Sequence, residues 1–227
     1  MRIGGLEKNT LLDYPGKIAC ILYTIGCNFR CPYCHNPELV DETAEEIPLE
    51  SIWYFLEKRR GLIDGVVITG GEPTLHEDLP GFIRQIKNLG YLVKLDSNGT
   101  RPKILKKLLQ EKLIDYIAMD IKSPLEMYTY TVGRPVLPET LRTSIELIKN
   151  SGIEYEFRTT VVKALLKPQD MEQIGKEISG AKTYYLQKFS GGKILNPQFR
   201  NKVTYSDDEF NELRKMMLQY VSYCGIR

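Results

Sequence analysis

Three cysteines, Cys27, Cys31 and Cys34, stand at a Cys-x3-Cys-x2-Cys spacing. Offsets of four and seven residues would place their thiols on one face of a helix. Pro32 opposes a helix because it lacks a backbone donor and its ring clashes with the preceding turn, and Gly26 also favours a loop. We therefore predict a loop whose three thiolates converge on one metal centre.

The number of cysteines helps to decide whether zinc or an iron–sulfur cluster binds there. Structural zinc takes four ligands, usually from two paired groups, and no second Cys/His pair follows in the chain. His35 could supply a fourth ligand, but its position next to Cys34 would strain the site. A [4Fe–4S] cluster normally takes four cysteines, so three would leave one iron open to a substrate or cofactor. The count favours a catalytic iron–sulfur cluster over the alternative, a non-catalytic zinc or electron-transfer module.

Length and composition are typical of a single soluble domain spanning residues 1–227, with 42% hydrophobic and 26% charged residues. The net charge of +2 gives no argument for a nucleic-acid partner. The sequence has no apolar run long enough for a membrane span and no signal-peptide core. Five cysteines, an odd number, argue against a disulfide framework. We expect a cytoplasmic protein with reduced thiols and with neither a nucleic-acid nor a membrane partner.

Strand-like and helical segments alternate about six times along the chain, which indicates βαβ units and a parallel sheet. Apolar runs predict strands at 18–24, 65–69, 92–95, 116–119, 154–162 and 183–189. Helical periodicity predicts helices at 49–58, at 79–89, from Pro102 onward, at 141–149, at 168–179 and after Ser206. Residues 123–138 are expected to form a polar loop. The polar clusters follow strands, so we expect them at the carboxyl edge of the sheet.

With the aromatic Tyr33 before the third cysteine, the motif resembles that of the radical S-adenosylmethionine (SAM) superfamily. The resemblance implies a partial (β/α)6 TIM-like barrel of parallel strands. Six repeats agree with it, since a closed eight-stranded barrel typically needs about 250 residues. The resemblance also implies that SAM chelates the open iron, and that one electron from the cluster cleaves SAM to methionine and a 5′-deoxyadenosyl radical. That radical would take a hydrogen atom from the substrate.

Gly70-Gly71-Glu72 would indicate only a tight turn if it stood alone. Its place after the second strand matches the superfamily motif whose backbone and Glu hold the SAM amino group. Glycines allow the backbone to come close to a ligand, and Glu72 can accept hydrogen bonds from an ammonium. The resemblance further implies that Tyr33 and His35 lie near bound SAM.

Asp96-Ser97-Asn98-Gly99 would otherwise be read as a capping turn, and Asp120-Ile121-Lys122 as a surface ion pair. Both follow strands at positions where glycyl-radical-enzyme activases resemble one another. In pyruvate formate-lyase activase the matching groups bind a monovalent cation beside SAM. The ligands that the resemblance implies here are Asp96, Ser97, Asp120 and the Ala118 carbonyl. Ser97 would also contact SAM, and Lys122 and Arg158 would reach its carboxylate.

Two N-terminal stretches, 4–16 and 26–39, resemble the activating proteins of anaerobic ribonucleoside-triphosphate reductase. That resemblance implies a glycyl radical enzyme as partner and a flavodoxin- or ferredoxin-like electron donor. A radical SAM enzyme acting on a small molecule, such as a 7-deazaguanine-forming synthase, is the alternative. Outside these motifs, Cys20 is expected in the core, Cys224 has no expected role, and His76 is expected to be a solvated loop residue.

Overall fold

The computed structural model of the protein describes all residues from 1 to 227. The chain divides into two compact units. Unit 1 comprises Met1–Asn28, Glu38–Ser97 and Lys103–Ile117, and unit 2 comprises Phe29–Pro37, Asn98–Pro102 and Ala118–Arg227. The single domain expected over residues 1–227 stays a prediction.

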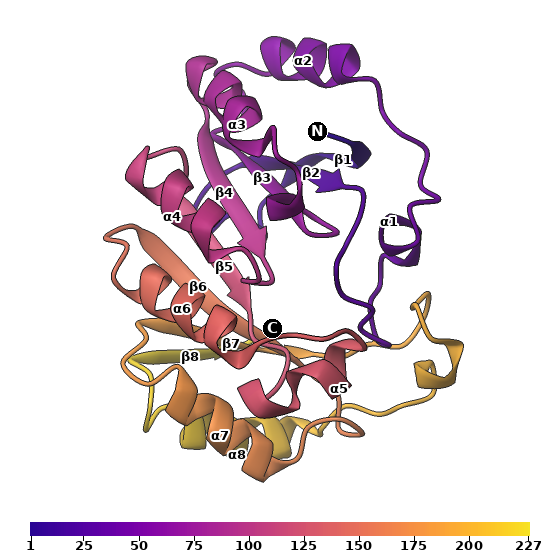
Figure 1. Ribbon diagram of the computed structural model, residues 1–227, viewed down its shortest axis with the longest axis vertical. Coiled ribbons are helices and arrows are strands. Elements are labelled where there is room, and N and C mark those ends of the chain that lie inside the picture. Colours follow the sequence, from indigo (N-terminus) through magenta and orange to yellow (C-terminus); the bar gives the residue numbers. More distant parts are fainter. The chain divides into compact units, whose positions relative to one another are not determined.

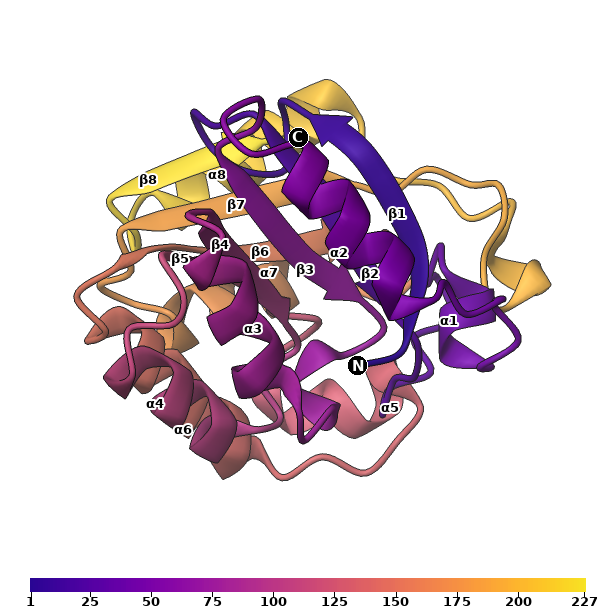
Figure 2. The same ribbon diagram turned by 90° about the horizontal axis from the view of Figure 1, so that it is seen from above.

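Unit 1 is built on four strands and the first residues of a fifth. The four are β1 (Ile3–Thr10), β2 (Ala19–Thr24), β3 (Gly65–Gly70) and β4 (Leu92–Ser97). β1 runs antiparallel beside β2 (Figure 2). β2, β3 and β4 run parallel, with Gly65 opposite both Ala19 and Leu92. Parallel strands covered on both faces are nearly continuous apolar runs, which is why β2, β3 and β4 were predictable.

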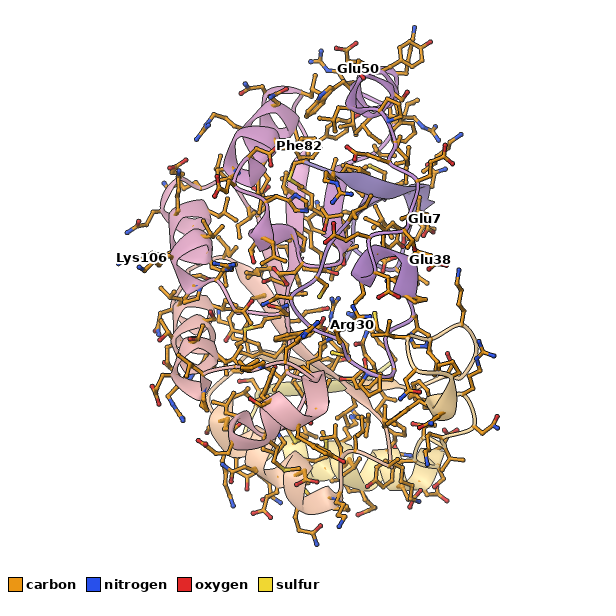
Figure 3. The ribbon with its side chains drawn as sticks, turned by 45° about the vertical axis from the view of Figure 1, so that its right-hand side comes forward. Glu7, Arg30, Glu38, Glu50, Phe82 and Lys106 are labelled. Atoms are coloured by element: carbon orange, nitrogen blue, oxygen red, sulfur yellow. The ribbon has the colours of Figure 1, made fainter.

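Two helices lie wholly in unit 1, α2 (Leu49–Lys58) and α3 (Leu79–Asn88). The unit also contains all but the first residue of α1 (Pro37–Val40) and α4 (Pro102–Gln110). The ring centres of Trp53 in α2 and Phe82 in α3 lie 4.8 Å apart, so aromatic packing joins these helices. Figure 3 shows Glu50 of α2 and Lys106 of α4 pointing away from the fold, as expected for the polar face of an amphipathic helix.

β5 (Tyr116–Asp120) begins in unit 1 and ends in unit 2. The other strands of unit 2 are β6 (Glu154–Val161), β7 (Thr183–Lys188) and β8 (Tyr223–Ile226), and β7 runs parallel to both β6 and β8. The sheet contains eight strands in chain order. All six predicted strands are confirmed, whereas β1 and β8 were missed.

Unit 2 also contains α5 (Tyr128–Val132), α6 (Pro138–Lys149), α7 (Pro168–Glu177) and α8 (Asp207–Met217). α7 and α8 lie side by side (Figure 1). The helix predicted after Ser206 is α8, and Ser206 is its N-cap because its hydroxyl accepts from the Glu209 N–H. None of the helices in the protein is long and apolar enough to cross a lipid bilayer.

The prediction of a polar loop at 123–138 is wrong. This stretch contains a 3-10 turn, Leu125–Met127, followed by the short helix α5. The polar composition misled the prediction, because Tyr128 and Thr131 are buried even though they carry hydroxyl groups. The α/β class with a mostly parallel sheet is confirmed.

Candidate active site

The predicted cysteine loop is confirmed as non-helical. Within unit 2 the Cys34 N–H donates to the Cys31 carbonyl over 3.0 Å, which folds the two cysteines into one turn. The Asn196 N–H donates to the Pro32 carbonyl over 2.9 Å and fixes the middle of that turn. Pro32 leaves its own nitrogen without a donor, so the turn is anchored through its carbonyl.

Cys27 belongs to unit 1 and follows Gly26. Gly26 has φ of 95°, in the left-handed region that glycine adopts without strain. Its N–H donates to the Leu39 carbonyl over 2.8 Å. Because Cys27 and the Cys31–Cys34 turn lie in different units, a common centre for the three thiols stays a prediction.

None of the five cysteines is in a disulfide. Cys20 is buried in β2, as expected. Cys224 is buried in β8, which identifies it as a core residue. Cys31 is also buried, and this burial raises the pKa of its thiol to about 11, while the charge of Lys122 acts in the opposite direction. A buried thiol of this kind reacts slowly with solvent but can be deprotonated by a bound metal, which suits a ligand.

Asp120, at the end of β5, is the centre of an ion cluster in unit 2. Its carboxylate lies 2.6 Å from Arg158 Nε and 3.0 Å from Lys122 Nζ. Burial alone would raise the pKa of Asp120, but the two adjacent cations hold it well below its ordinary value. Asp120 is therefore ionised and neutralised by side chains, and the predicted pair Lys122 and Arg158 is brought together on it.

Tyr128 of α5 connects this ion cluster to the cysteine loop. Its hydroxyl accepts from the Lys122 N–H over 2.9 Å and donates to the Asp120 carbonyl over 3.1 Å. Its ring lies 6.1 Å from that of Phe29, which begins the loop segment of unit 2. The wrongly predicted stretch thus contributes a positioning residue.

Tyr33, between Cys31 and Cys34, is buried and its hydroxyl has no hydrogen-bond partner. Burial also raises the pKa of this phenol well above its ordinary value, so it stays a neutral donor. A buried donor without a partner costs about 1–3 kcal/mol, which a ligand or water would recover. This orphaned hydroxyl fits the predicted cofactor-binding role of Tyr33.

Gly70 and Gly71 permit a close approach of two backbone segments within unit 1. Gly70 has φ of 111°, and a Cβ on Gly71 would lie 1.9 Å from the Gly26 carbonyl oxygen. The Glu72 N–H donates to that carbonyl over 2.8 Å. The glycines are thus required by packing of the β3 turn against the residue that precedes Cys27.

Glu72 follows these glycines and is almost completely buried, with 1% of its surface exposed. Its Oε1 accepts from the Ser97 hydroxyl over 2.9 Å and from the Thr74 N–H over 3.1 Å, and the Thr74 hydroxyl also donates to it. The carboxylate is therefore held in one orientation. Ser97, predicted as a cation ligand, donates to Glu72 in this structure.

Asp96, the other predicted carboxylate ligand, pairs with Lys94 on the same strand, β4. The Lys94 and Asp96 side chains are 1% and 9% exposed. Residues two apart point to the same face of a strand, so the pair follows from the β4 backbone. Lys94 was not singled out in the sequence.

The two histidines have different settings. His35 is exposed, and its Nε2 lies 2.8 Å from the Ser190 carbonyl, within unit 2. His76 is not the solvated residue expected, since it is half-buried and its Nε2 lies 3.0 Å from the Ile25 carbonyl. Burial lowers the pKa of His76, which favours the neutral ring.

Sequence reasoning also missed an ion pair in unit 2. Glu156 of β6 is fully buried, and both of its carboxylate oxygens accept from Arg227, over 2.9 and 3.1 Å. Arg158 Nη1 lies 3.9 Å from Glu156, which links this pair to Asp120. The available signal was a charged residue inside an apolar strand, because such residues are buried only when paired. The same signal marks Lys94.

Comparison with known proteins gives the family. The model of the radical SAM superfamily matches residues 21–178. A Methanocaldococcus jannaschii protein, provisionally named a glycyl-radical enzyme activating enzyme, is 32% identical over 231 residues, covering 99% of this chain and 95% of the relative. The 7-carboxy-7-deazaguanine synthase of Aquifex aeolicus is 37% identical over 75 residues, or 33% of each chain.

A solved structure agrees on the fold. A domain of the pyruvate-formate lyase-activating enzyme from Bacteroides vulgatus superposes with a TM-score of 0.58 at 15% identity, covering 72% of this chain and 99% of that domain. The protein belongs to the radical SAM superfamily and is an enzyme. Membership implies a [4Fe–4S] cluster and SAM as cofactors. The anchored turn of Cys31 and Cys34, the orphaned Tyr33 hydroxyl and the two cations beside Asp120 fit both groups.

Proposed function

We propose that the protein activates anaerobic ribonucleoside-triphosphate reductase by generating a glycyl radical on it. The match to the M. jannaschii relative along 99% of the chain supports the activase activity. The choice of this reductase as partner rests on the resemblance of residues 4–16 and 26–39 to its activating proteins. The matches to two 7-carboxy-7-deazaguanine synthases cover 33% of the chain at 37% identity and 70% of the chain at 28% identity. Likeness over the full length favours an activase over an enzyme of small-molecule metabolism.

In this proposal Cys27, Cys31 and Cys34 hold the cluster and leave one iron open. The residues that would hold SAM are Tyr33, His35, Gly70, Gly71, Glu72, Ser97, Lys122 and Arg158. When bound, the cluster and SAM would supply a reductive cleavage that yields a hydrogen-abstracting 5′-deoxyadenosyl radical.

The side chains would bind and orient SAM through complementary charge. Glu72, oriented by Ser97 and Thr74, would accept from the SAM ammonium. Lys122 and Arg158 contact the Asp120 carboxylate, and Arg227 contacts the Glu156 carboxylate. The Lys122 ammonium and the Arg158 guanidinium would donate charge-assisted hydrogen bonds to the SAM carboxylate.

The implied monovalent cation is the one cofactor whose predicted ligands do not fit. Asp96 contacts Lys94, Ser97 donates to Glu72, and Asp120 contacts two cations. The proposed function therefore does not include this ion.

The proposal also covers partners and organisation. We place the enzyme in the cytoplasm, with a flavodoxin- or ferredoxin-like protein as electron donor, because cysteines outside disulfides and a reduced cluster need a reducing compartment. The two units would act as one radical SAM domain over residues 1–227. The family match supports this, since residues 21–178 include parts of both units.

The test mixes anaerobically reconstituted protein with SAM, dithionite and purified reductase. We expect a glycyl doublet in the electron paramagnetic resonance (EPR) spectrum, and no doublet with pyruvate formate-lyase in place of the reductase. Cleavage of SAM without a doublet on the reductase would contradict the proposed partner. Conversion of a pterin to a 7-deazaguanine would instead support the alternative.

A further inference from the structure

The Lys94–Asp96 pair is unusual because a lysine is buried inside a parallel sheet. The Lys94 side chain is 1% exposed, and its ammonium contacts Asp96 Oδ1. An ammonium removed from water without a partner costs several kcal/mol, so a buried lysine needs a specific counter-charge. In unit 1 Asp96 provides it.

An aromatic group completes the surroundings of this ammonium. Lys94 Nζ lies 5.8 Å from the centre of the Tyr116 ring, a distance at which a ring face attracts a cation. Tyr116 is itself held by Tyr14, with ring centres 5.9 Å apart. The Lys94 ammonium thus contacts both a carboxylate and the face of an aromatic ring, the two groups that commonly bind a cationic ligand.

Asp96 stands directly before Ser97, whose hydroxyl orients Glu72 over 2.9 Å. A cation that neutralises Asp96 therefore also holds the end of β4 in place. Ser97 lies at that end and donates its hydroxyl to the Glu72 carboxylate. A free monovalent ion could do this in exchange with solvent. A lysine does so permanently, through the covalent chain.

We propose that Lys94 is the built-in counter-cation of Asp96, so that SAM binding in this enzyme requires no monovalent metal ion. Asp120 in unit 2 likewise has side-chain counter-cations, because Arg158 and Lys122 contact its carboxylate. This inference rests on the SAM site of the proposed function and not on the identity of the partner enzyme. Lys94 is a positioning residue, since it acts on Glu72 through Asp96 and Ser97.

The test measures the dissociation constant (Kd) of SAM for the reconstituted holoenzyme in choline chloride and in potassium, sodium or ammonium chloride. We expect the wild-type Kd to agree within about twofold among the four salts, because an internal cation is not exchanged. Lys94→Met should raise Kd about tenfold or more in choline, and ammonium or potassium should restore much of the loss. Lys106→Met, on the exposed face of α4, is the matched control and should leave Kd unchanged in all salts.

A second variant guards against misfolding. Lys94→Met/Asp96→Asn removes both charges, so it should fold even where the single variant does not. Binding of thallous ion, followed by 205Tl nuclear magnetic resonance, should be absent in wild type and present in Lys94→Met. If Lys94→Met does not fold, the wild-type salt series and thallous binding decide the question.

Wild-type SAM binding that needs potassium, or thallous binding by wild type, would overturn the proposal. A missing glycyl radical with salt-independent SAM binding would affect only the proposed partner.

Discussion

The Ser97 hydroxyl donates to Glu72 Oε1 over 2.9 Å, which joins the end of β4 to the turn after β3. Removing it by Ser97→Ala should loosen Glu72 and weaken SAM binding about tenfold to a hundredfold, the loss expected for one hydrogen bond to a charged group. Ser97→Thr keeps a hydroxyl and should retain most of the affinity. Isothermal titration of the holoenzyme measures both. Equal Kd values for Ser97→Ala and wild type would show that Ser97 does not position Glu72.

A substitution at Gly71 tests its close approach to the Gly26 carbonyl in unit 1. In Gly71→Ala the new Cβ would lie 1.9 Å from the Gly26 carbonyl oxygen, so the backbone must move. We expect a loss of about 1–3 kcal/mol in the free energy of unfolding, as for other overpacked sites. Gly81→Ala is the matched control, because a Cβ there meets nothing within 4 Å and Gly81 is inside helix α3. It should stabilise by about 0.5–1 kcal/mol. Denaturant titration compares the two, and an unchanged Gly71→Ala would refute the packing.

His76 predicts a pH dependence of stability. Burial lowers its pKa in the folded protein below the ordinary value of 6.5, so the unfolded chain binds the proton more readily. The stabilisation is therefore complete above pH 6.5 and is lost as the pH falls through and below that value. His76→Gln can still donate to the Ile25 carbonyl but does not titrate. Its unfolding free energy should fall less than that of wild type on acidification from about pH 7 to about pH 5. Parallel curves for the two proteins would argue against a lowered pKa.

We expect Glu156 and Arg227 to show a coupling energy in the free energy of unfolding. Arg227→Met leaves a buried carboxylate without its bidentate partner and should cost about 1–3 kcal/mol. Glu156→Gln/Arg227→Met removes both charges and should recover part of that loss. A double-mutant cycle by denaturant titration gives the coupling. Additive single effects would mean that the pair contributes nothing specific.

The cysteine loop and six strands could be predicted because their signals are local. Pro32 excludes a helix by itself, and the apolar run at residues 65–69 indicates a buried strand by itself. β1 escaped prediction because glycines and charged residues interrupt its apolar pattern, and its pairing with β2 is what makes it a strand. α5 escaped because burial of Tyr128 is a tertiary effect.

The charge partners were harder to predict than the motifs. Asp96, Asp120 and Glu72 were found from their positions after strands, but their partners depend on which side chains the fold brings together. Arg227 is 71 residues from Glu156 in the chain, and no local pattern joins them. Lys94 lies two residues from Asp96, yet the ring beside its ammonium belongs to Tyr116 of another strand.

The most direct test of the account is reductive SAM cleavage by the reconstituted protein and five single Cys→Ala variants, with 5′-deoxyadenosine measured by chromatography. Cys20 and Cys224 are buried in strands and serve as matched controls for the three loop cysteines. We predict that cleavage is abolished in the variants of Cys27, Cys31 and Cys34 and persists in the two strand variants. Cleavage that survives loss of any one loop cysteine would contradict the account.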